Sequence, residues 1–237
     1  MAVNDQRTIA PAEKDVAREV IEEFQTVVLG SGGMLDAMLP PLAFLVGNAL
    51  AGNQAGMTAA LGTAGSFVVL RLLQRQPVAY ALIGLGGSLL SFVLAQVLRR
   101  AEIFFLPDMI TNLALAAVSL LSILLRRPLV AWTSHLVRRW PRDWYWHPRV
   151  LPAYTEITLA WAIYFLAQAL LQWRAFQLQD AARMATLGLF TGWPGTLVLL
   201  ILTYLYGTWR LARLAGPSVA EFRADAPSPW IGQPRGF

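Results

Sequence analysis

The segment that decides the fold is AEIFFLPDMITNLALAAVSLLSILLRR, residues 101–127. Pro107 and Asp108 stand near its start, a long apolar run follows, and Arg126 and Arg127 end it. An α-helix needs about 20 predominantly apolar residues to cross a hydrocarbon core about 30 Å thick. A carboxylate near the start of a helix and cations near its end complement the helix dipole. We therefore predict a membrane-spanning helix over residues 103–125.

Apolar stretches of similar length lie on both sides of this segment. Hydrophobic residues make up 56% of the 237-residue chain and charged residues 14%, well below the roughly 25% that is usual in soluble domains. The connections at Gly52–Asn53 and at 99–102 are very short, so the helices that they join should be antiparallel neighbours. These features predict an all-α polytopic membrane helix bundle with six transmembrane helices, at 34–51, 55–73, 78–98, 103–125, 153–173 and 193–211.

Arginines at the ends of these stretches crowd onto one side of the membrane. Twelve lie near span ends on that side and four on the other. Because positively charged loops stay in the cytoplasm, the asymmetry predicts that both the N-terminus and the C-terminus are cytoplasmic. The larger group is Arg18, Arg71, Arg75, Arg126, Arg127, Arg138, Arg139, Arg142, Arg149, Arg210, Arg213 and Arg223, and the smaller is Arg99, Arg100, Arg174 and Arg183.

The chain divides into a cytoplasmic N-terminal segment over 1–33, a six-span membrane domain over 34–212, and a cytoplasmic tail over 213–237 that contains prolines. Apolar residues recur at helical spacing from Val16 to Leu29, which predicts an N-terminal amphipathic helix. Its polar face is acidic, so anionic lipid headgroups should repel it. We expect it to dock on the protein's own cytoplasmic face or on a partner protein. The prolines of the tail predict an extended conformation.

Residues 128–146, between the fourth and fifth spans, predict a basic interfacial helix. Pro128 can open a helix at its first position. Apolar side chains then line one side while His135 and arginines line another, the pattern of a helix that lies in the membrane interface. The aromatic rings at the end of this segment are expected to anchor at the level of the lipid headgroups: Trp140, Trp144, Tyr145 and Trp146.

Several function classes are disfavoured by the residues that the chain lacks. It contains no cysteine, which excludes disulfides, thiol catalysis and cysteine-bound metal centres. The net charge of +5 arises from arginines at helix ends, so we expect no nucleic-acid partner. His135 and His147 have no neighbouring carboxylates in a metal-binding pattern. With no nucleophile elbow and no zinc-protease motif in the chain, we expect no enzymatic activity, no cofactor and no metal.

Carboxylates inside membrane spans are costly, which makes Asp36, Asp108 and Glu156 candidate functional residues. Each also stands near the start of its span, where the helix dipole alone would stabilise it. Asp36 and Arg71 lie at similar depth on two helices joined by a tight turn, so we predict that they form an ion pair. Glu156 enters from the same side and could join that pair or bind a loop arginine.

A polar stripe runs along one face of the fourth span, formed by Asp108, Asn112, Ser119 and Ser122 at helical spacing. Asn48 and Gln168 are expected to reach the same outer half of the bundle from the first and fifth spans. Two interpretations remain open. The polar groups line a solute cavity, or they form hydrogen bonds between helices. Separate small residues in the second and third spans predict close packing of helices: Gly56, Ala60, Gly62, Ala64 and Gly65, then Gly84, Gly86, Gly87 and Ser88.

Several of these motifs together resemble an uncharacterised bacterial membrane family, domain of unknown function 3159. The resemblance covers residues 34–212, and its most specific pieces are FFLPDMITN and RRPL. The order LP-x-x-F, F-x-x-P-x-x-x-N and W-x-x-x-F is also distantly similar to the intracellular septation protein A group, which is implicated in cell-envelope maintenance. That group has a basic residue just before the central proline, where this chain has Leu106. Neither group supplies a binding residue that can be carried over.

Two function classes follow from these observations. The first is a non-enzymatic component of envelope maintenance, a scaffold, or a subunit of a membrane complex, with membrane-protein partners bound through the cytoplasmic helices. The second is a small-solute or ion transporter or channel that uses the polar residues of the outer half. In either case we expect a multi-pass protein of the bacterial cytoplasmic (inner) membrane, with the lipid bilayer as its main partner and its oligomeric state open.

Overall fold

The computed structural model describes residues 33–75, 79–233 and 237. The chain divides into two compact units, Met1–Met34 and Leu35–Phe237, and nearly all of the first lies outside the described residues. The predicted amphipathic helix over 16–29 therefore stays a prediction. Within the described residues the protein is all-helical, with 81% helix and no strand.

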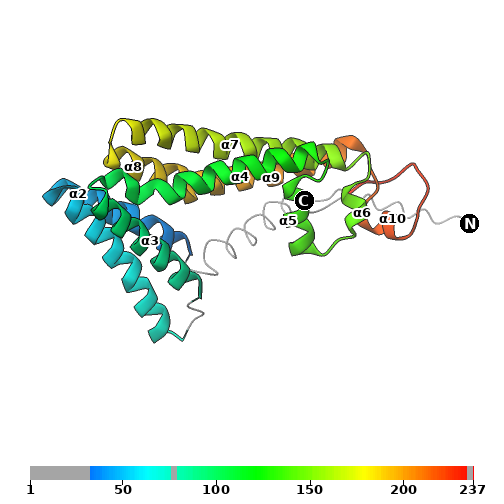
Figure 1. Cartoon of the computed structure of the whole chain (residues 1–237). Helices are drawn as coiled ribbons and strands as arrows, with labels where there is room; N and C mark the ends of the chain where they lie inside the picture. Colours follow the sequence, from blue (N-terminus) through cyan, green and yellow to red (C-terminus); the bar gives the residue numbers. More distant parts are fainter. Residues whose placement is uncertain (1–32, 76–78, 234–236) are drawn as a thin grey trace, which may run out of the picture. The chain divides into compact units, whose positions relative to one another are not determined.

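The helices follow one another with short connections, in the order shown in Figure 1. They are α2 (Gly33–Leu73), α3 (Ala79–Val97), the 3-10 helix η1 (Ala101–Phe105), α4 (Leu106–Leu124), α5 (Leu129–Arg138), α6 (Arg142–Tyr145), α7 (Leu151–Gln177), α8 (Ala181–Thr191), α9 (Trp193–Leu214) and α10 (Val219–Arg223).

Four helical segments of the described chain are long and apolar enough to cross a membrane, and α3 contributes a shorter apolar helix at Gly84–Val97. The four segments are Met38–Leu73, Ala101–Leu124, Leu151–Gln177 and Ala181–Leu214. The protein therefore has the helices of a multi-pass membrane protein. The number differs from six partly because Met38–Leu73 includes the predicted turn between the first two spans, so that two predicted spans are counted as one segment despite a break at Ala51 and Gly52.

The backbone of α2 leaves the helical conformation in its middle. Ala51 has φ −146° and ψ 20°, and Gly52 has φ 81°, a conformation that glycine adopts at no steric cost. On either side of this break the two arms approach closely. A Cβ atom placed on Gly47 would lie 2.8 Å from the Ala55 carbonyl oxygen, and one on Gly56 would lie 2.8 Å from the Phe44 carbonyl oxygen. The chain thus folds back at Gly52, as its short connection predicted.

Close packing does not explain the glycine run in α3. A Cβ atom added to Gly84, Gly86 or Gly87 would meet no described heavy atom within 4 Å. Helix α3 instead meets the second arm of α2 near its other end, where Ala95 shares a buried apolar cluster with Met57 and Ala60, and where Gln54 and Gln96 each donate an amide hydrogen bond to the other, over 2.7 and 2.5 Å. Within the described residues the predicted close packing is therefore wrong for these three glycines and for Gly62 and Gly65 of α2, whereas Gly56 confirms it.

The most extensive helix pair of the described chain is α4 with α7, and α7 also packs along α9 (Figure 1). The α7–α9 contact includes a hydrogen bond from Trp161 Nε1 to Thr203 Oγ1, over 3.0 Å. Helix α8 packs against both α7 and η1. Asp180 begins α8 by accepting a hydrogen bond from the backbone nitrogen of Arg183.

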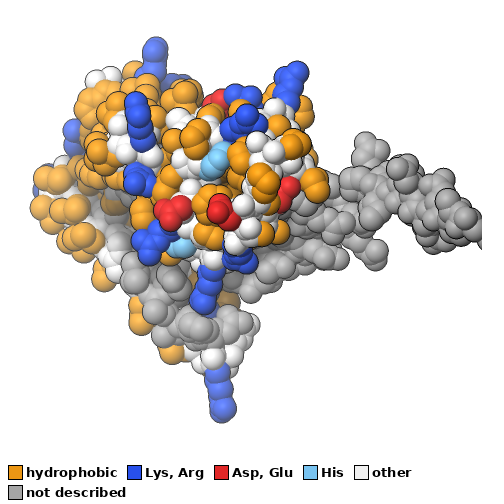
Figure 2. All heavy atoms as spheres, turned by 90° about the vertical axis from the view of Figure 1, so that its right-hand side faces the viewer, with side chains coloured by type: hydrophobic (Ala, Val, Ile, Leu, Met, Phe, Trp, Pro, Cys, Tyr) orange, Lys and Arg blue, Asp and Glu red, His pale blue; other side chains and the backbone are white. Residues whose placement is uncertain are grey.

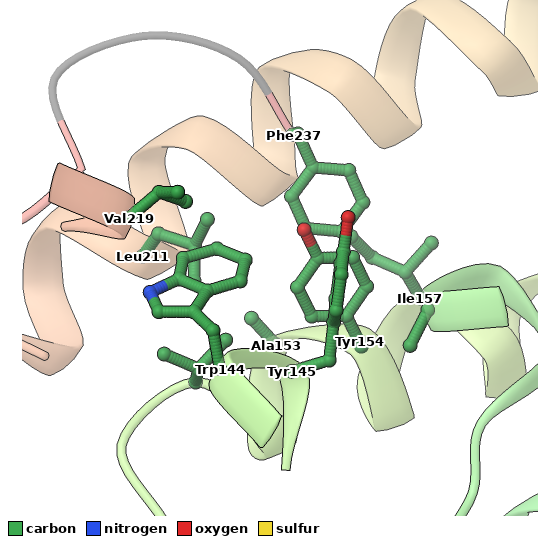
Figure 3. Close-up of a cluster of buried hydrophobic side chains, with 10 residues drawn as sticks. Trp144, Tyr145, Ala153, Tyr154, Ile157, Leu211, Val219 and Phe237 are labelled. Carbon is green, nitrogen blue, oxygen red and sulfur yellow. The ribbon is translucent and has the colours of Figure 1, made fainter. Parts of the chain in front are cut away.

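An aromatic cluster joins α6 to α7, α9 and α10 (Figure 3). Trp144 and Tyr145 at its centre are both 0% exposed, and Trp144 Nε1 donates a hydrogen bond to the Pro217 carbonyl oxygen over 2.8 Å. These two rings cannot anchor in lipid headgroups, so that prediction was wrong for them. Burial against Tyr154 and Val150 removes them from the surface, because the short helix α6 turns them inward. Trp146 and Trp140 remain partly exposed.

The prolines of the tail predicted an extended conformation, but part of the tail is helical. Ser218 and Glu221 form a reciprocal capping box that starts α10, which satisfies two backbone donors at the helix start. Further along, Phe237 is 9% exposed and its ring stacks on Tyr154, with the centroids 4.4 Å apart. Arg138 Nε donates a hydrogen bond to the Phe237 backbone oxygen over 3.0 Å.

Candidate functional site

A cavity of about 430 Å³ lies where η1, α4, α7, α8 and α9 meet, and prolines of α2 and Ser88 of α3 complete its wall. Three of the residues that the sequence singled out line it: Asp108, Asn112 and Gln168. They come from two helices far apart in sequence, because α4 and α7 pack against one another along their length.

The polar wall of the cavity is a small hydrogen-bonded network. Asp108 and Asn112 are four residues apart, so they share one face of α4. Gln172 of α7 bridges them, since its Nε2 donates to Asp108 Oδ2 over 2.5 Å and its Oε1 accepts from Asn112 Nδ2 over 3.2 Å. Asn112 is 6% exposed and Gln172 is 1% exposed, whereas Asp108 remains exposed. The network therefore presents its carboxylate at the cavity.

The opposite wall is built around a break in the helix that follows. Gly192, between α8 and α9, has φ −69° and ψ −116°, so the backbone leaves the helical conformation there, while the hydrogen bonds from Gly192 N to the Gly188 oxygen and from Thr196 N to the Gly192 oxygen, both 2.9 Å, continue across this residue. The carbonyl oxygen of Thr191 at this break accepts hydrogen bonds from the Tyr164 hydroxyl and from Gln168 Nε2, the latter over 2.6 Å. A side chain at position 195 would be crowded, because a Cβ on Gly195 would lie 2.5 Å from Tyr164 Oη. The break is thus held by two side chains of α7.

The remaining wall is apolar and aromatic. Phe104, Phe105, Phe165 and Trp193 all line the cavity. Phe105 is held edge to face by Phe104, with the ring centroids 5.2 Å apart, and by the fully buried Phe44, at 4.9 Å. Rings packed in this way have little freedom to move, so this wall is preorganised.

Among the described residues that line the cavity, Asp108 is the only charged one, and none of them is an arginine, lysine or histidine. The nearby cation Arg100 is paired elsewhere, since its Nε lies 2.6 Å from Glu102 Oε1 and its guanidinium lies over the ring of Phe176. The cavity therefore carries a formal negative charge when Asp108 is ionised.

Two other predicted residues lie away from this cavity. Asn48 is not among its lining residues and instead packs at the close approach of the α2 arms, near Gly56. Glu156 binds Arg210 of α9, whose Nε and Nη2 each donate a hydrogen bond of 2.7 Å to its carboxylate, and the Tyr206 hydroxyl donates a third. The partner of Glu156 is therefore a helical arginine, and the expected loop arginine does not fill that role.

The predicted ion pair between Asp36 and Arg71 stays a prediction. The backbone of Asp36 belongs to α2, but its side chain lies outside the described part of the structure. Gln172, by contrast, was missed by the sequence reasoning. Gln172 lies four residues after Gln168, so both share one face of α7, and this spacing could have identified Gln172 as part of the polar set.

Exposed arginines surround the end of the molecule that carries α5, α6 and α10 (Figure 2). They include Arg127, whose guanidinium lies over the Trp146 ring, 4.4 Å from its centroid. His147 lies in the same region, and burial together with the charge of Arg149 lowers its pKa. Within the described residues no group of three or more His, Asp or Glu is placed to hold a metal ion.

Comparison with protein families gives one match. The model of the DUF3159 family, described as a protein of unknown function, matches residues 29–212. The chain belongs to this family. The match covers all of the residues that line the cavity. No curated protein and no solved structure matches the chain. The similarity to the intracellular septation protein A group stays a prediction.

Proposed function

We propose that this DUF3159 protein is a non-enzymatic membrane protein that binds a small polar solute inside its helical bundle and carries it across the membrane. The observation that supports this most is the convergence of Asp108, Asn112 and Gln168 on one cavity. Polar and ionisable groups inside a membrane are costly and usually mark a pathway or a binding site. Hydrogen bonds between helices account for Asn112 and Gln172, but the one bond from Gln172 to Asp108 leaves that carboxylate exposed and able to accept further donors.

The interrupted helix at Gly192 supports the same proposal. Backbone that is not helical is tolerated at membrane depth where it is buried in protein or lines a cavity. Many transporters place their substrate between such broken helices near the middle of the membrane. Here Gly192 and Gly188 both line the cavity, beside the carbonyl oxygens that Tyr164 and Gln168 hold.

We further propose six spans with both termini in the cytoplasm of a bacterial cell, in its cytoplasmic membrane. The break at Gly52 supports counting the two arms of α2 as two spans, and α3, α4, α7 and α9 supply the others. The arginines around α5, α6 and α10 support a cytoplasmic position for that end. Reporter fusions after residues 53, 100 and 141 test this topology, because only the fusion at 141 should be active with a reporter that requires the cytoplasm.

The wet cavity is tested by introduced thiols, since the chain has no cysteine of its own. Maleimides react with the thiolate, which forms where water reaches the sulfur. We expect Ser88→Cys and Thr196→Cys, both at the cavity, to be labelled much faster than Ser119→Cys, which is 0% exposed and does not line it. Equal, slow labelling at all three positions would argue against a solute site.

A scaffold is the second candidate function. One observation favours it: the aromatic cluster around Trp144 fixes α5, α6 and α10 as a rigid platform, on which Leu136 and Val137 are 73% and 82% exposed. A scaffold would bury this apolar surface against a membrane-protein partner. Copurification of wild type beside Leu136→Ser tests it. A stable partner lost in the variant would support the scaffold, and no partner with either would weaken it.

A further inference from the structure

We infer that the solute of this cavity is a small organic monocation, bound by the Asp108 carboxylate and by the aromatic wall of Phe104, Phe105, Phe165 and Trp193. The inference rests on the proposed function and names the chemical class of its substrate. Three properties of the cavity support it: its charge, its aromatic lining and its size.

The charge of the cavity has one sign. Within the described part of the chain, Asp108 is the only charged lining residue, and the amides of Asn112 and Gln168 are the other strongly polar side chains. An anionic solute would meet a carboxylate without any compensating cation. A neutral solute would leave a carboxylate facing an uncharged partner in a low-dielectric site. A single positive charge on the solute balances that of Asp108.

The position of Asp108 in its network also favours a cation over a neutral solute. One carboxylate oxygen, Oδ2, accepts the hydrogen bond from Gln172. The hydrogen-bond capacity of a carboxylate exceeds one donor, because each oxygen has two lone pairs. Asp108 is an exposed residue and lines the cavity, so part of this capacity is open to a donor from a bound solute. Gln172 thus fixes the carboxylate without neutralising it, as a binding site for a cation requires.

The aromatic wall selects an organic cation over a metal ion. Cations are attracted to the faces of aromatic rings, and clusters of such rings recognise quaternary ammonium groups. A hard metal cation would instead need several oxygen ligands at short distances, and Asp108 supplies the one carboxylate among the described lining residues. The volume of about 430 Å³ lies within the range of small-molecule sites and far exceeds that of a bare ion.

The test compares two probes of the same shape and different charge. Choline carries a quaternary ammonium, and 3,3-dimethyl-1-butanol replaces that nitrogen by carbon. Binding of each to the purified full chain is measured by calorimetry. We expect choline to bind at least about tenfold more tightly than its neutral isostere, a factor that corresponds to about 1.4 kcal/mol.

Two test substitutions, each with its own control, separate the contribution of the charge from that of the rings. Asp108→Asn keeps the shape and should abolish the preference for choline. Asp180→Asn is its matched control: it makes the same chemical change at the start of α8, away from the cavity, and asparagine caps a helix as well as aspartate does. Phe165→Leu should weaken choline binding while Phe165→Tyr, which retains the ring, should not.

The outcomes distinguish this inference from the proposed function. Equal affinity for the two probes, or an unchanged preference in Asp108→Asn, would overturn the monocation while leaving a solute cavity in place. Binding of neither probe, with fast thiol labelling at positions 88 and 196, would also overturn it and leave the proposed function standing. Binding of neither probe with slow labelling would overturn both.

Discussion

Replacing Gln172 by leucine should loosen the contact between α4 and α7. The wild-type side chain makes two hydrogen bonds across this contact, one to the Asp108 carboxylate and one from the Asn112 amide. Hydrogen bonds between membrane helices contribute about 0.6 kcal/mol each on average, and those to a charged group about 1.5 kcal/mol or more. Because Gln172 is 1% exposed, solvent does not replace either bond. We expect the variant to lose about 2 kcal/mol of unfolding free energy.

The free energy of unfolding is measured by titrating the protein in mixed micelles with a denaturing detergent and following helicity by circular dichroism. Gln177→Leu is the matched control, since Gln177 is an exposed residue at the end of the same helix. We expect its stability to stay within about 0.5 kcal/mol of wild type. The reasoning is refuted if Gln172→Leu is as stable as wild type, or if both variants lose the same amount.

A double-mutant cycle with Asp108→Leu then isolates the bond between the two side chains. If Gln172 acts through Asp108, the double variant should be about 1 kcal/mol more stable than the sum of the single losses implies. Strict additivity would mean that the 2.5 Å contact contributes nothing to stability.

Three other contacts can be tested by substitutions that remove or disturb them. Arg210→Lys should lower the melting temperature in detergent, because an ammonium group cannot reproduce the two parallel hydrogen bonds to Glu156; an unchanged value would contradict this. Gly207→Ala places a Cβ atom 2.3 Å from the Phe237 ring, so it should expel that ring and lose up to about 2 kcal/mol. Phe237→Ala should cost a similar amount, and combining the two should add little. Backbone hydrogen bonds lower the Glu221 pKa from 4.5 to about 2, so the order of the tail should persist above pH 4.5 and be lost as the pH falls towards 2. Hydrogen exchange measures this, and Glu221→Gln should remove the pH dependence.

Local sequence was enough to find the cavity residues but not their partner. Asp108 and Asn112 stood out because polar side chains at helical spacing interrupt an apolar span. Gln172 drew no attention because it lies near the end of its span, where glutamine is unremarkable. Its role depends on the packing of α4 against α7, which brings residues 60 and 64 positions apart into hydrogen-bond contact.

The sequence predicted that the aromatic residues after α5 anchor in the lipid headgroups, but Trp144 and Tyr145 are buried inside the protein. Trp144 and Tyr145 are amphipathic rings beside arginines, the usual composition of a membrane interface. Whether such rings are buried depends on which other parts of the chain pack around them. Here Pro217, Tyr154 and Phe237 surround them, and two of these three lie more than 70 residues further along the chain.

The sequence by itself determined that the chain is all-helical, apolar enough for several membrane spans, and a member of its family, because periodicity and composition act over short distances. Only the tertiary structure decided which polar groups meet. It joined Asp108 to Gln172 at a cavity and bound Glu156 to Arg210, while Asn48 was left in a helix contact. The physical reason is that helix packing sets these neighbours, and a helix with polar residues on one face can meet several partners with similar local chemistry.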